Sequence, residues 1–318
     1  VHRVARATPA RHVSDRDPIG HVPVLLAETL DLLCPQAGDV VLDCTLGRGG
    51  HALSLGAAAK GVSIVGLDLD DSNRAFAAER LDNANITNTT SSGNFVRAPE
   101  ALQAAEQTAN IVLADLGFAS NQVDNHERGL SFLKDGPLDM RLDPTATVTA
   151  ASLLASLPEQ ELSAIIRRYG EDPYADRIAQ KIALKREQRP IDSTGLLADL
   201  VREAYGARAR TSRQHPATRT FHAIRIAVND VLAALQTLLD RLGKAMRTGD
   251  TSWLAPDARI GIIAFHSLED RPVKTCFVSL VREGLAVDLS AGAVRAGDDE
   301  QDRNPRCRSA RLRVIRRV

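Results

Sequence analysis

Apolar residues along this chain follow two alternating patterns, short continuous runs and longer stretches with helical spacing. The continuous runs are rich in aliphatic and β-branched residues, which is typical of buried strands. They lie at residues 40–43, 62–68, 110–115 and 259–265. Stretches typical of helices lie at residues 24–34, 52–59 and 98–105. Strands that alternate with helices predict an α/β fold with an open, parallel sheet.

The middle and the end of the chain depart from this alternation. Only short helices are expected from about residue 144 onward, at residues 158–169, 174–186 and 194–205. One long helix is then predicted to run through Leu242, and residues 311–314 alternate in polarity like an edge strand. We therefore expect a small all-helical domain over residues 141–213, inserted into an α/β domain. The α/β domain would comprise residues 21–140 and 214–318, after a disordered tail over residues 1–20.

A glycine-rich turn follows the first predicted strand, in the stretch Asp43 to His51. The glycines do not have the spacing of a P-loop or of a dinucleotide fingerprint. The spacing Asp-x-x-x-Gly-x-Gly, from Asp43 to Gly49, instead resembles the first motif of S-adenosylmethionine-dependent methyltransferases. Taken alone, the same residues are also compatible with an ordinary tight turn between a strand and a helix.

Three predicted strands end in a carboxylate, at Asp43, Asp68 and Asp115. The carboxyl ends of parallel strands share one edge of an open sheet, where ligands bind. Asp68 lies 19 residues after Gly49, close to the roughly 20 residues that separate a glycine turn from a ribose-binding acid. Phe95 follows a polar loop, and its position is compatible either with packing against an adenine ring or with a place in the core. The acids favour a nucleoside-containing cofactor.

Composition adds few constraints on function. The net charge of the 318 residues is +0, but seven arginines and no acid lie from Arg303 to the end. The helix predicted at 174–186 is also basic, which is typical of a solvated face and less often of an RNA-binding one. The four cysteines lack metal-site spacing, no apolar run approaches the ~20 residues of a membrane helix, and a reducing, cytoplasmic location is expected. No metal and no membrane are expected.

Several motifs together resemble the bacterial 16S ribosomal RNA cytosine-N4 methyltransferase family, over the chain from His21 to its end. In order along the chain they read HVPVLLAETL, LDCTLGRGGH, DLG with Ser120 and Gln122, ERGLSF, DGPLDMR, HPATRTF, FHSLEDR and NPRCRSA. The resemblance implies a Rossmann-like class I methyltransferase domain with an inserted helical domain for RNA recognition. It implies S-adenosylmethionine as cofactor and, as substrate, a cytidine in the decoding region of 16S rRNA in the small ribosomal subunit.

The resemblance also implies which residues bind the cofactor. Its matching positions are Gly49, Gly50, His51, Asp68, Phe95, Asp115 and Gln122. Two departures stand out: Phe118, Ala119 and Asn121 differ from the family's pattern after Asp-Leu-Gly, and the segment between Phe277 and Asn304 is shorter than expected. The first departure concerns the shape of the cytosine pocket.

The chemistry of an exocyclic amine suggests two catalytic candidates. The lone pair of the cytosine amine is conjugated into the ring, so methyl transfer needs hydrogen-bond acceptors that orient its N–H groups. Asp115 and nearby backbone carbonyls are candidate acceptors, and His266 is a candidate for the released proton. A histidine at a strand end whose ring is satisfied by a backbone partner is an equally good interpretation of His266. The base must leave its stack, so a single-stranded or loosely paired RNA, and not DNA, is expected.

Other functions remain open from the sequence. A non-catalytic rRNA-binding assembly factor could keep the same fold, and a methyltransferase on another substrate could keep the same core. The oligomeric state, the target nucleotide, and the choice between naked rRNA and an assembled subunit also remain open.

Overall fold

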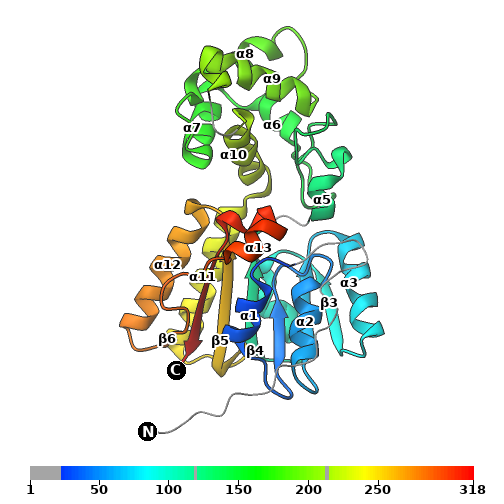
Figure 1. Cartoon of the computed structure of the whole chain (residues 1–318), viewed down its shortest axis with the longest axis vertical. Coiled ribbons are helices and arrows are strands. Elements are labelled where there is room, and N and C mark those ends of the chain that lie inside the picture. The colour runs from blue at the N-terminus through cyan, green and yellow to red at the C-terminus, as the bar shows by residue number, and fades with distance from the viewer. Residues whose placement is uncertain (1–22, 118–119, 212–214) are drawn as a thin grey trace. The chain divides into compact units, whose positions relative to one another are not determined.

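The computed structural model describes residues 23–117, 120–211 and 215–318 (Figure 1). The chain forms two compact units. The first combines Val1–Leu116 with Leu239–Val318, and the second comprises Gly117–Leu238. Each unit is described by itself below. The expected insert, residues 141–213, lies wholly within the second unit, which also includes the loops before it and most of the helical segment after it.

The first unit contains a seven-stranded sheet with the order β3-β2-β1-β4-β5-β7-β6. Its strands are β1 Val40–Asp43, β2 Ser63–Asp68, β3 Asn88–Ser92, β4 Ala109–Asp115, β5 Leu254–Ala264, β6 Ala286–Asp288 and β7 Arg311–Arg317. The pairings from β3 to β5 are parallel, whereas β7 is antiparallel to both β5 and β6. The chain proceeds from β1 to one side and returns at β4 on the other, so β1 and β4 form the topological switch point. Ligands of open α/β sheets bind outside the carboxyl ends of the strands at such a point.

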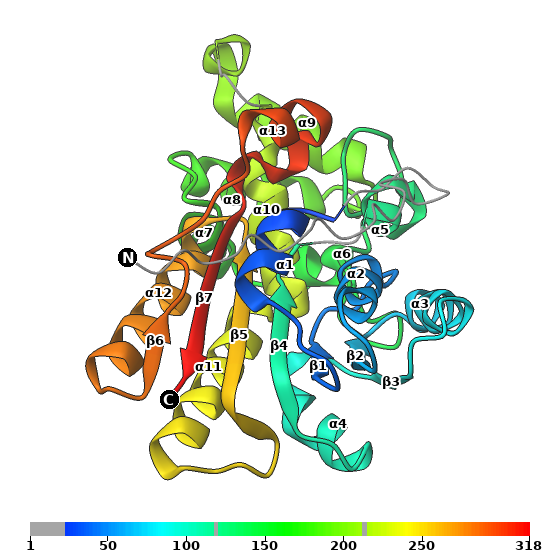
Figure 2. The ribbon, with the colours of Figure 1, turned by 60° about the horizontal axis from the view of Figure 1, so that its bottom comes forward.

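Both faces of the sheet in the first unit carry apolar side chains, and helices cover them. One face packs against α1 Leu26–Leu33, α2 Gly50–Ala58 and α3 Asp71–Asn83, through a buried aliphatic cluster (Figure 2). The unit also contains η1 Phe95–Arg97, α4 Ala98–Ala104, α12 Ser267–Arg282, α13 Asp298–Arg303, η4 Pro305–Ser309 and the later part of α11 Val231–Thr248. The apolar runs that predicted buried strands are thus buried from both sides.

Two strands differ from the sequence-based expectation. The segment Asn88–Ser92 reads as a polar loop, but it pairs in parallel with β2 as the edge strand β3. An edge strand has one unpaired side in water, so polar residues are tolerated there. The prediction that residues 311–314 form an edge strand is wrong in its position, because β7 lies between β5 and β6.

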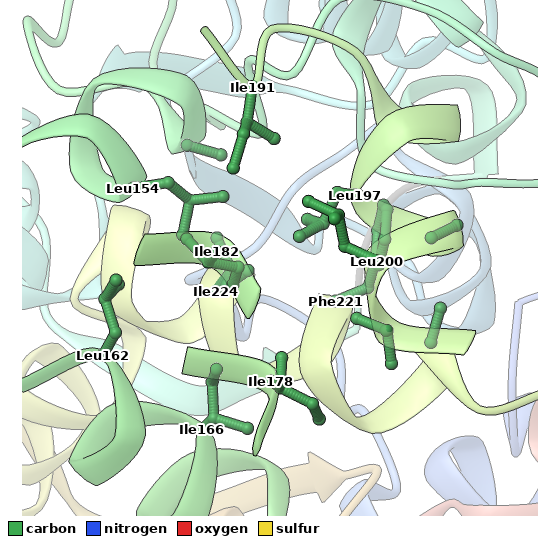
Figure 3. Packing of buried hydrophobic residues seen from close by; sticks show 14 of the residues in the cluster. Leu154, Leu162, Ile166, Ile178, Ile182, Ile191, Leu197, Leu200, Phe221 and Ile224 are labelled. Atoms are coloured by element: carbon green, nitrogen blue, oxygen red, sulfur yellow. The ribbon is translucent and has the colours of Figure 1, made fainter. Parts of the chain in front are cut away.

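The second unit is built from helices around its own core (Figure 3). Its elements are α5 Ser120–Asp124, η2 His126–Arg128, α6 Ala150–Ser156, α7 Glu159–Gly170, α8 Ala175–Arg186, α9 Thr194–Tyr205, η3 Gly206–Arg210, α10 Ala217–Asn229 and the start of α11. The predicted short helices are present, and the side chain of Ser193 caps α9. Fully buried Ile166, Ile178 and Phe221 come from three different helices of this core.

The long helix predicted through Leu242 is instead two helices, α10 and α11. Asp230 interrupts it with a φ of 48°, in the left-handed region. The side chain of Asn229 donates to the carbonyl of Met140 at 2.8 Å and accepts from the amide of Leu142 at 2.7 Å. These tertiary bonds hold the helix end in place, and aspartate tolerates the left-handed conformation better than most residues do. Apolar periodicity carries no signal for such a break.

Candidate active site

The glycine turn leaves β1 at the switch point of the sheet. Gly47 and Gly49 have φ angles of 51° and 75°, a region in which side chains other than glycine's are strained. A Cβ atom on Gly49 would lie 3.1 Å from that of Ala77, and one on Gly50 would lie 2.7 Å from Cγ of Pro23. The turn therefore needs glycine for its backbone conformation at Gly49 and for close packing at Gly50.

Asp68 ties this turn to the end of β2. Its two carboxylate oxygens accept hydrogen bonds from the amides of Gly47 and Asp70, both at 2.8 Å. Partial burial raises the pKa of Asp68, and the bonds from Asp70 and Gly47 oppose that rise. Since a carboxylate offers about four lone-pair sites, these two bonds leave acceptor capacity for hydroxyl groups. The position at the end of β2 is the one expected for a ribose-binding acid.

Asp43 is buried at the end of β1, with 2% of its surface exposed. Burial raises the pKa of Asp43 to about 6, against the favourable charge of His51 and a bond from the amide of Thr45. The nearby carboxylates of Asp115 and Asp68 raise it further. Mutual repulsion among these acids makes the switch point a favourable place for a positively charged group.

His51 and Asp115 face each other across the switch point. Nε2 of His51 lies 3.0 Å from the carbonyl oxygen of Val24. Because a carbonyl only accepts, Nε2 carries a hydrogen. Nδ1 lies 3.7 Å from Oδ2 of Asp115, whose side chain is 23% exposed whereas that of His51 is buried. The arrangement leaves part of the carboxylate at the solvent-facing edge of the sheet.

Phe95 begins η1, immediately after β3. The amide of Gly93 donates to the carbonyl of Asp68 at 3.2 Å, which fastens this segment to the end of β2. The side chain of Asn94 then accepts from the amide of Val96 and starts the 3₁₀ turn. Phe95 is 7% exposed, so packing within the unit accounts for most of its surface. Its role against an adenine ring stays a prediction.

His266 follows β5, the strand that pairs with β4 in parallel so that Asp115 is opposite Ile263. Nε2 of His266 lies 2.7 Å from Oε1 of Glu269, which is buried. The other oxygen of Glu269 accepts from the amide of Phe265 at 2.8 Å. His266 is thus held by a buried carboxylate at the same sheet edge as Asp115. Glu269 was not among the predicted site residues, although it follows His266 by three residues at the start of a helix.

The remaining predicted residue of the cofactor site belongs to the other unit. Gln122 lies on α5 and is buried. Its proposed contact with the cofactor stays a prediction, because it depends on the arrangement of the two units. Of the residues that depart from the family pattern, Phe118 and Ala119 lie outside the described residues.

Part of the C-terminal arginine cluster is structural. The buried carboxylate of Asp270 accepts from Nη1 of Arg311 at 2.8 Å and from Nε of Arg313 at 2.7 Å. Burial opposes ionisation of Asp270, but Arg313 and Arg311 hold its pKa below the usual range. Arg317 is itself buried and donates to the carbonyls of Asp250 and Leu254. These side chains stabilise β7, a structural role that the sequence alone did not indicate. Arg308 on η4, by contrast, is exposed.

No helix in the described part of the chain is long and apolar enough to span a membrane. Among the same residues, no group of three or more histidine, cysteine or acidic side chains is arranged to hold a metal ion.

Comparisons with known proteins agree over nearly the whole chain. The model of the MraW methylase family matches residues 18–318. A protein of Mycobacterium avium (strain 104) named ribosomal RNA small subunit methyltransferase H is 40% identical, covering 96% of this chain and 84% of its own length. Proteins with the same name from Symbiobacterium thermophilum and Synechococcus sp. (strain CC9902) are 40% and 43% identical. The alignment with the Symbiobacterium protein covers 96% of that protein and 93% of this chain. The alignment with the Synechococcus protein covers 98% of that protein and 95% of this chain.

Proposed function

Because this chain belongs to the MraW methylase family, we propose that it methylates the small-subunit ribosomal RNA, with S-adenosylmethionine as the methyl donor. The finer proposal is transfer to the exocyclic N4 amine of a cytidine in the decoding region of the 16S rRNA. The single observation that carries the methyl-transfer proposal is the convergence of the glycine turn, Asp68 and Asp115 at the switch point of the sheet. The choice of the N4 amine of a cytidine rests on the resemblance of the sequence motifs. An enzyme that modifies ribosomal RNA would act in the cytoplasm.

The residues at the switch point fit S-adenosylmethionine. When bound, this cofactor supplies a methyl group on a positively charged sulfur. The positive φ angles at Gly47 and Gly49 leave a backbone that a ligand can approach closely. The raised pKa of Asp43, caused by burial and in part by neighbouring acids, indicates a site that a positive charge would relieve. Residues Gly49, Gly50, His51, Asp68, Phe95 and Asp115 would hold the cofactor, and the resemblance of the sequence to the family adds Gln122.

Asp115 is the candidate that orients the substrate amine. Its carboxylate is partly exposed and ends β4 at the switch point. Accepting an N–H from the cytosine amine would turn the amine's lone pair out of conjugation and aim it for transfer, an effect of orientation. His266, held by buried Glu269 at the end of the neighbouring strand, is the candidate acceptor for the proton that the amine then loses. The base must be unstacked to reach this edge.

Mapping of methylated nucleotides tests the proposed function. Ribosomal RNA from cells with and without this protein would be digested and compared by mass spectrometry. We expect a single N4-methylated cytidine in the small-subunit RNA to lose its methyl group when the gene is absent and to regain it on complementation. An unchanged methylation pattern would contradict the proposal. If calorimetry also detected no binding of S-adenosylmethionine, a non-catalytic assembly role would replace it.

A further inference from the structure

We infer that Thr45 is a positioning residue for Asp115, and the inference rests on the proposed function. Oγ1 of Thr45 accepts a hydrogen bond from the backbone amide of Asp115 at 2.7 Å. The two residues are far apart in the sequence but lie side by side at the switch point, one just after β1 and the other at the end of β4. The bond therefore connects the glycine turn to Asp115, the residue proposed to orient the substrate amine.

The strand pairing explains why a side chain is needed at this position. The last paired residues of β1 and β4 are Asp43 and Leu113, and the amide of Cys44 donates to the carbonyl of Leu113 at 2.8 Å. Beyond this point the chain leaves β1 for the glycine turn, so the ladder supplies no further carbonyl for the amide of Asp115. The hydroxyl of Thr45 takes that place. A partly buried amide without an acceptor would be costly.

The opposite side of Asp115 is held by the regular ladder. The next amide along the chain, that of Leu116, donates to the carbonyl of Ile263 on β5 at 2.9 Å. Asp115 is thus held between β5 on one side and Thr45 on the other. If Thr45 loses its oxygen, this backbone loses its bond on the β1 side, while the bond to β5 and the contact of the carboxylate with His51 remain. The carboxylate is then held less firmly relative to the turn.

Thr45 is itself held on the cofactor side. Its backbone amide donates to Oδ1 of Asp43 at 3.0 Å, and Asp43 is buried. Hydrogen bonds therefore connect Asp43 to Thr45 and Thr45 to Asp115, from the start of the glycine turn to the end of β4. A misplacement on the order of 1 Å costs roughly 100-fold in rate when orientation is what a group supplies. Such a loss would appear in the transfer step more than in binding.

The test compares Thr45→Val with Thr45→Ser in the full-length protein. Valine keeps the shape but removes the oxygen, whereas serine keeps the oxygen. Three quantities are measured for each variant: the single-turnover rate on small ribosomal subunits at saturating cofactor, the affinity for S-adenosylmethionine by calorimetry, and the exchange rate of single backbone amides in the protein without ligands. The amide of Leu116, which bonds to β5, is the internal reference for exchange.

We expect Thr45→Val to slow transfer by roughly 10- to 100-fold, while the affinity for S-adenosylmethionine changes by less than about threefold. In this variant the amide of Asp115 should exchange faster, and the amide of Leu116 should not. Thr45→Ser should restore both the rate of methyl transfer and the exchange rate of the Asp115 amide. A valine variant with the rate of the unsubstituted protein, or a serine variant as slow as valine, would overturn the inference. A fall in cofactor affinity as large as the fall in rate would overturn it too. Inactivity of the unsubstituted protein would instead contradict the proposed function.

Discussion

Nδ1 of His51 lies 3.7 Å from Oδ2 of Asp115, across the switch point between β1 and β4. Because Nε2 of His51 donates to the carbonyl of Val24, Nδ1 is the ring nitrogen that faces the carboxylate of Asp115. The histidine of the glycine motif therefore connects three elements: the segment before α1, the start of α2 and the end of β4. It contributes to the site through its side chain as well as its backbone.

Asp68 should be required for cofactor affinity. We expect Asp68→Ala to weaken binding of S-adenosylmethionine by roughly 1–3 kcal/mol, because it removes acceptors for ribose and for the amide of Gly47. Calorimetric titration measures the effect. Asp71→Ala is the matched control, since Asp71 is an exposed acid on the next helix and pairs with Arg74. Equal affinities in the two variants would remove Asp68 from the cofactor site.

Asp43 should make the folded state less stable as the pH rises. Its pKa is raised from 3.8 to about 6 in the folded protein, chiefly by burial, so between these values the folded state binds more protons than the unfolded state. The free energy of unfolding then falls with rising pH, by an amount on the order of 3 kcal/mol from this group alone. Asparagine at this position cannot titrate but keeps an acceptor for the amide of Thr45.

The measurement is urea unfolding of the unsubstituted protein and of Asp43→Asn at pH 4, 5, 6 and 7. Other titrating groups largely cancel in the difference between the two proteins. We expect the stability of Asp43→Asn relative to the unsubstituted protein to increase from pH 4 to about pH 6 and to level off toward pH 7. A difference that stays flat over this range would mean that Asp43 keeps its ordinary pKa in the folded state.

Asp270 should stabilise the antiparallel edge of the sheet. Removing it leaves Arg313, which is 11% exposed, without its carboxylate partner. We expect Asp270→Ala to lower the free energy of unfolding by roughly 3 kcal/mol, the scale for breaking a buried ion pair from one side. Asp257→Asn is the matched control, because asparagine also tolerates the φ of 58° at this position. Asp257 lies on β5, its side chain is 74% exposed, and it pairs with Arg316 on β7, so the loss of this ion pair should cost about 0.5 kcal/mol. Similar losses in both variants would contradict a buried role for Asp270.

The arginines from Arg303 to the end of the chain are candidates for binding ribosomal RNA. Arg311 is held by the buried carboxylate of Asp270, whereas Arg306 and Arg308 on η4 are exposed and are the pair to test. We expect the double substitution of this pair by glutamine to weaken binding of ribosomal RNA and to reduce its dependence on salt. Filter binding over a range of salt concentrations measures both. An unaltered salt slope, with cofactor affinity intact, would place the RNA-binding surface elsewhere.

The parts of the fold that the sequence predicted are those in which burial and periodicity coincide. Strands such as β4 are apolar because both faces of the sheet are covered, and the glycines of the turn are needed for its φ angles. Strand β3 escaped prediction because an edge strand can be polar. The break at Asp230 escaped because its cause, the bonds of Asn229 to Met140 and Leu142, is tertiary.

Some residues of the candidate site could likewise be predicted from the sequence, and others could not. Asp68 and Asp115 could be found because an acid at the end of an apolar run is visible in the sequence. The contacts of Thr45 and Glu269 could not, because each depends on which atoms meet in space: Thr45 replaces a missing ladder carbonyl, and Glu269 turns toward His266.

Asp115→Asn should separate substrate orientation from cofactor binding. The amide keeps the shape and one acceptor oxygen, so the fold should survive, but the charged acceptor opposite Nδ1 of His51 is lost. We expect the barrier of methyl transfer to rise by roughly 2–4 kcal/mol, the scale for removing one preorganised electrostatic contact. Single-turnover kinetics on small ribosomal subunits at saturating S-adenosylmethionine measures this step, with Asp71→Asn as the control. If the rate recovers fully at saturation, Asp115 only binds the cofactor. The orientation of the amine would then fall to backbone carbonyls after β4, and His266 would become the leading catalytic candidate.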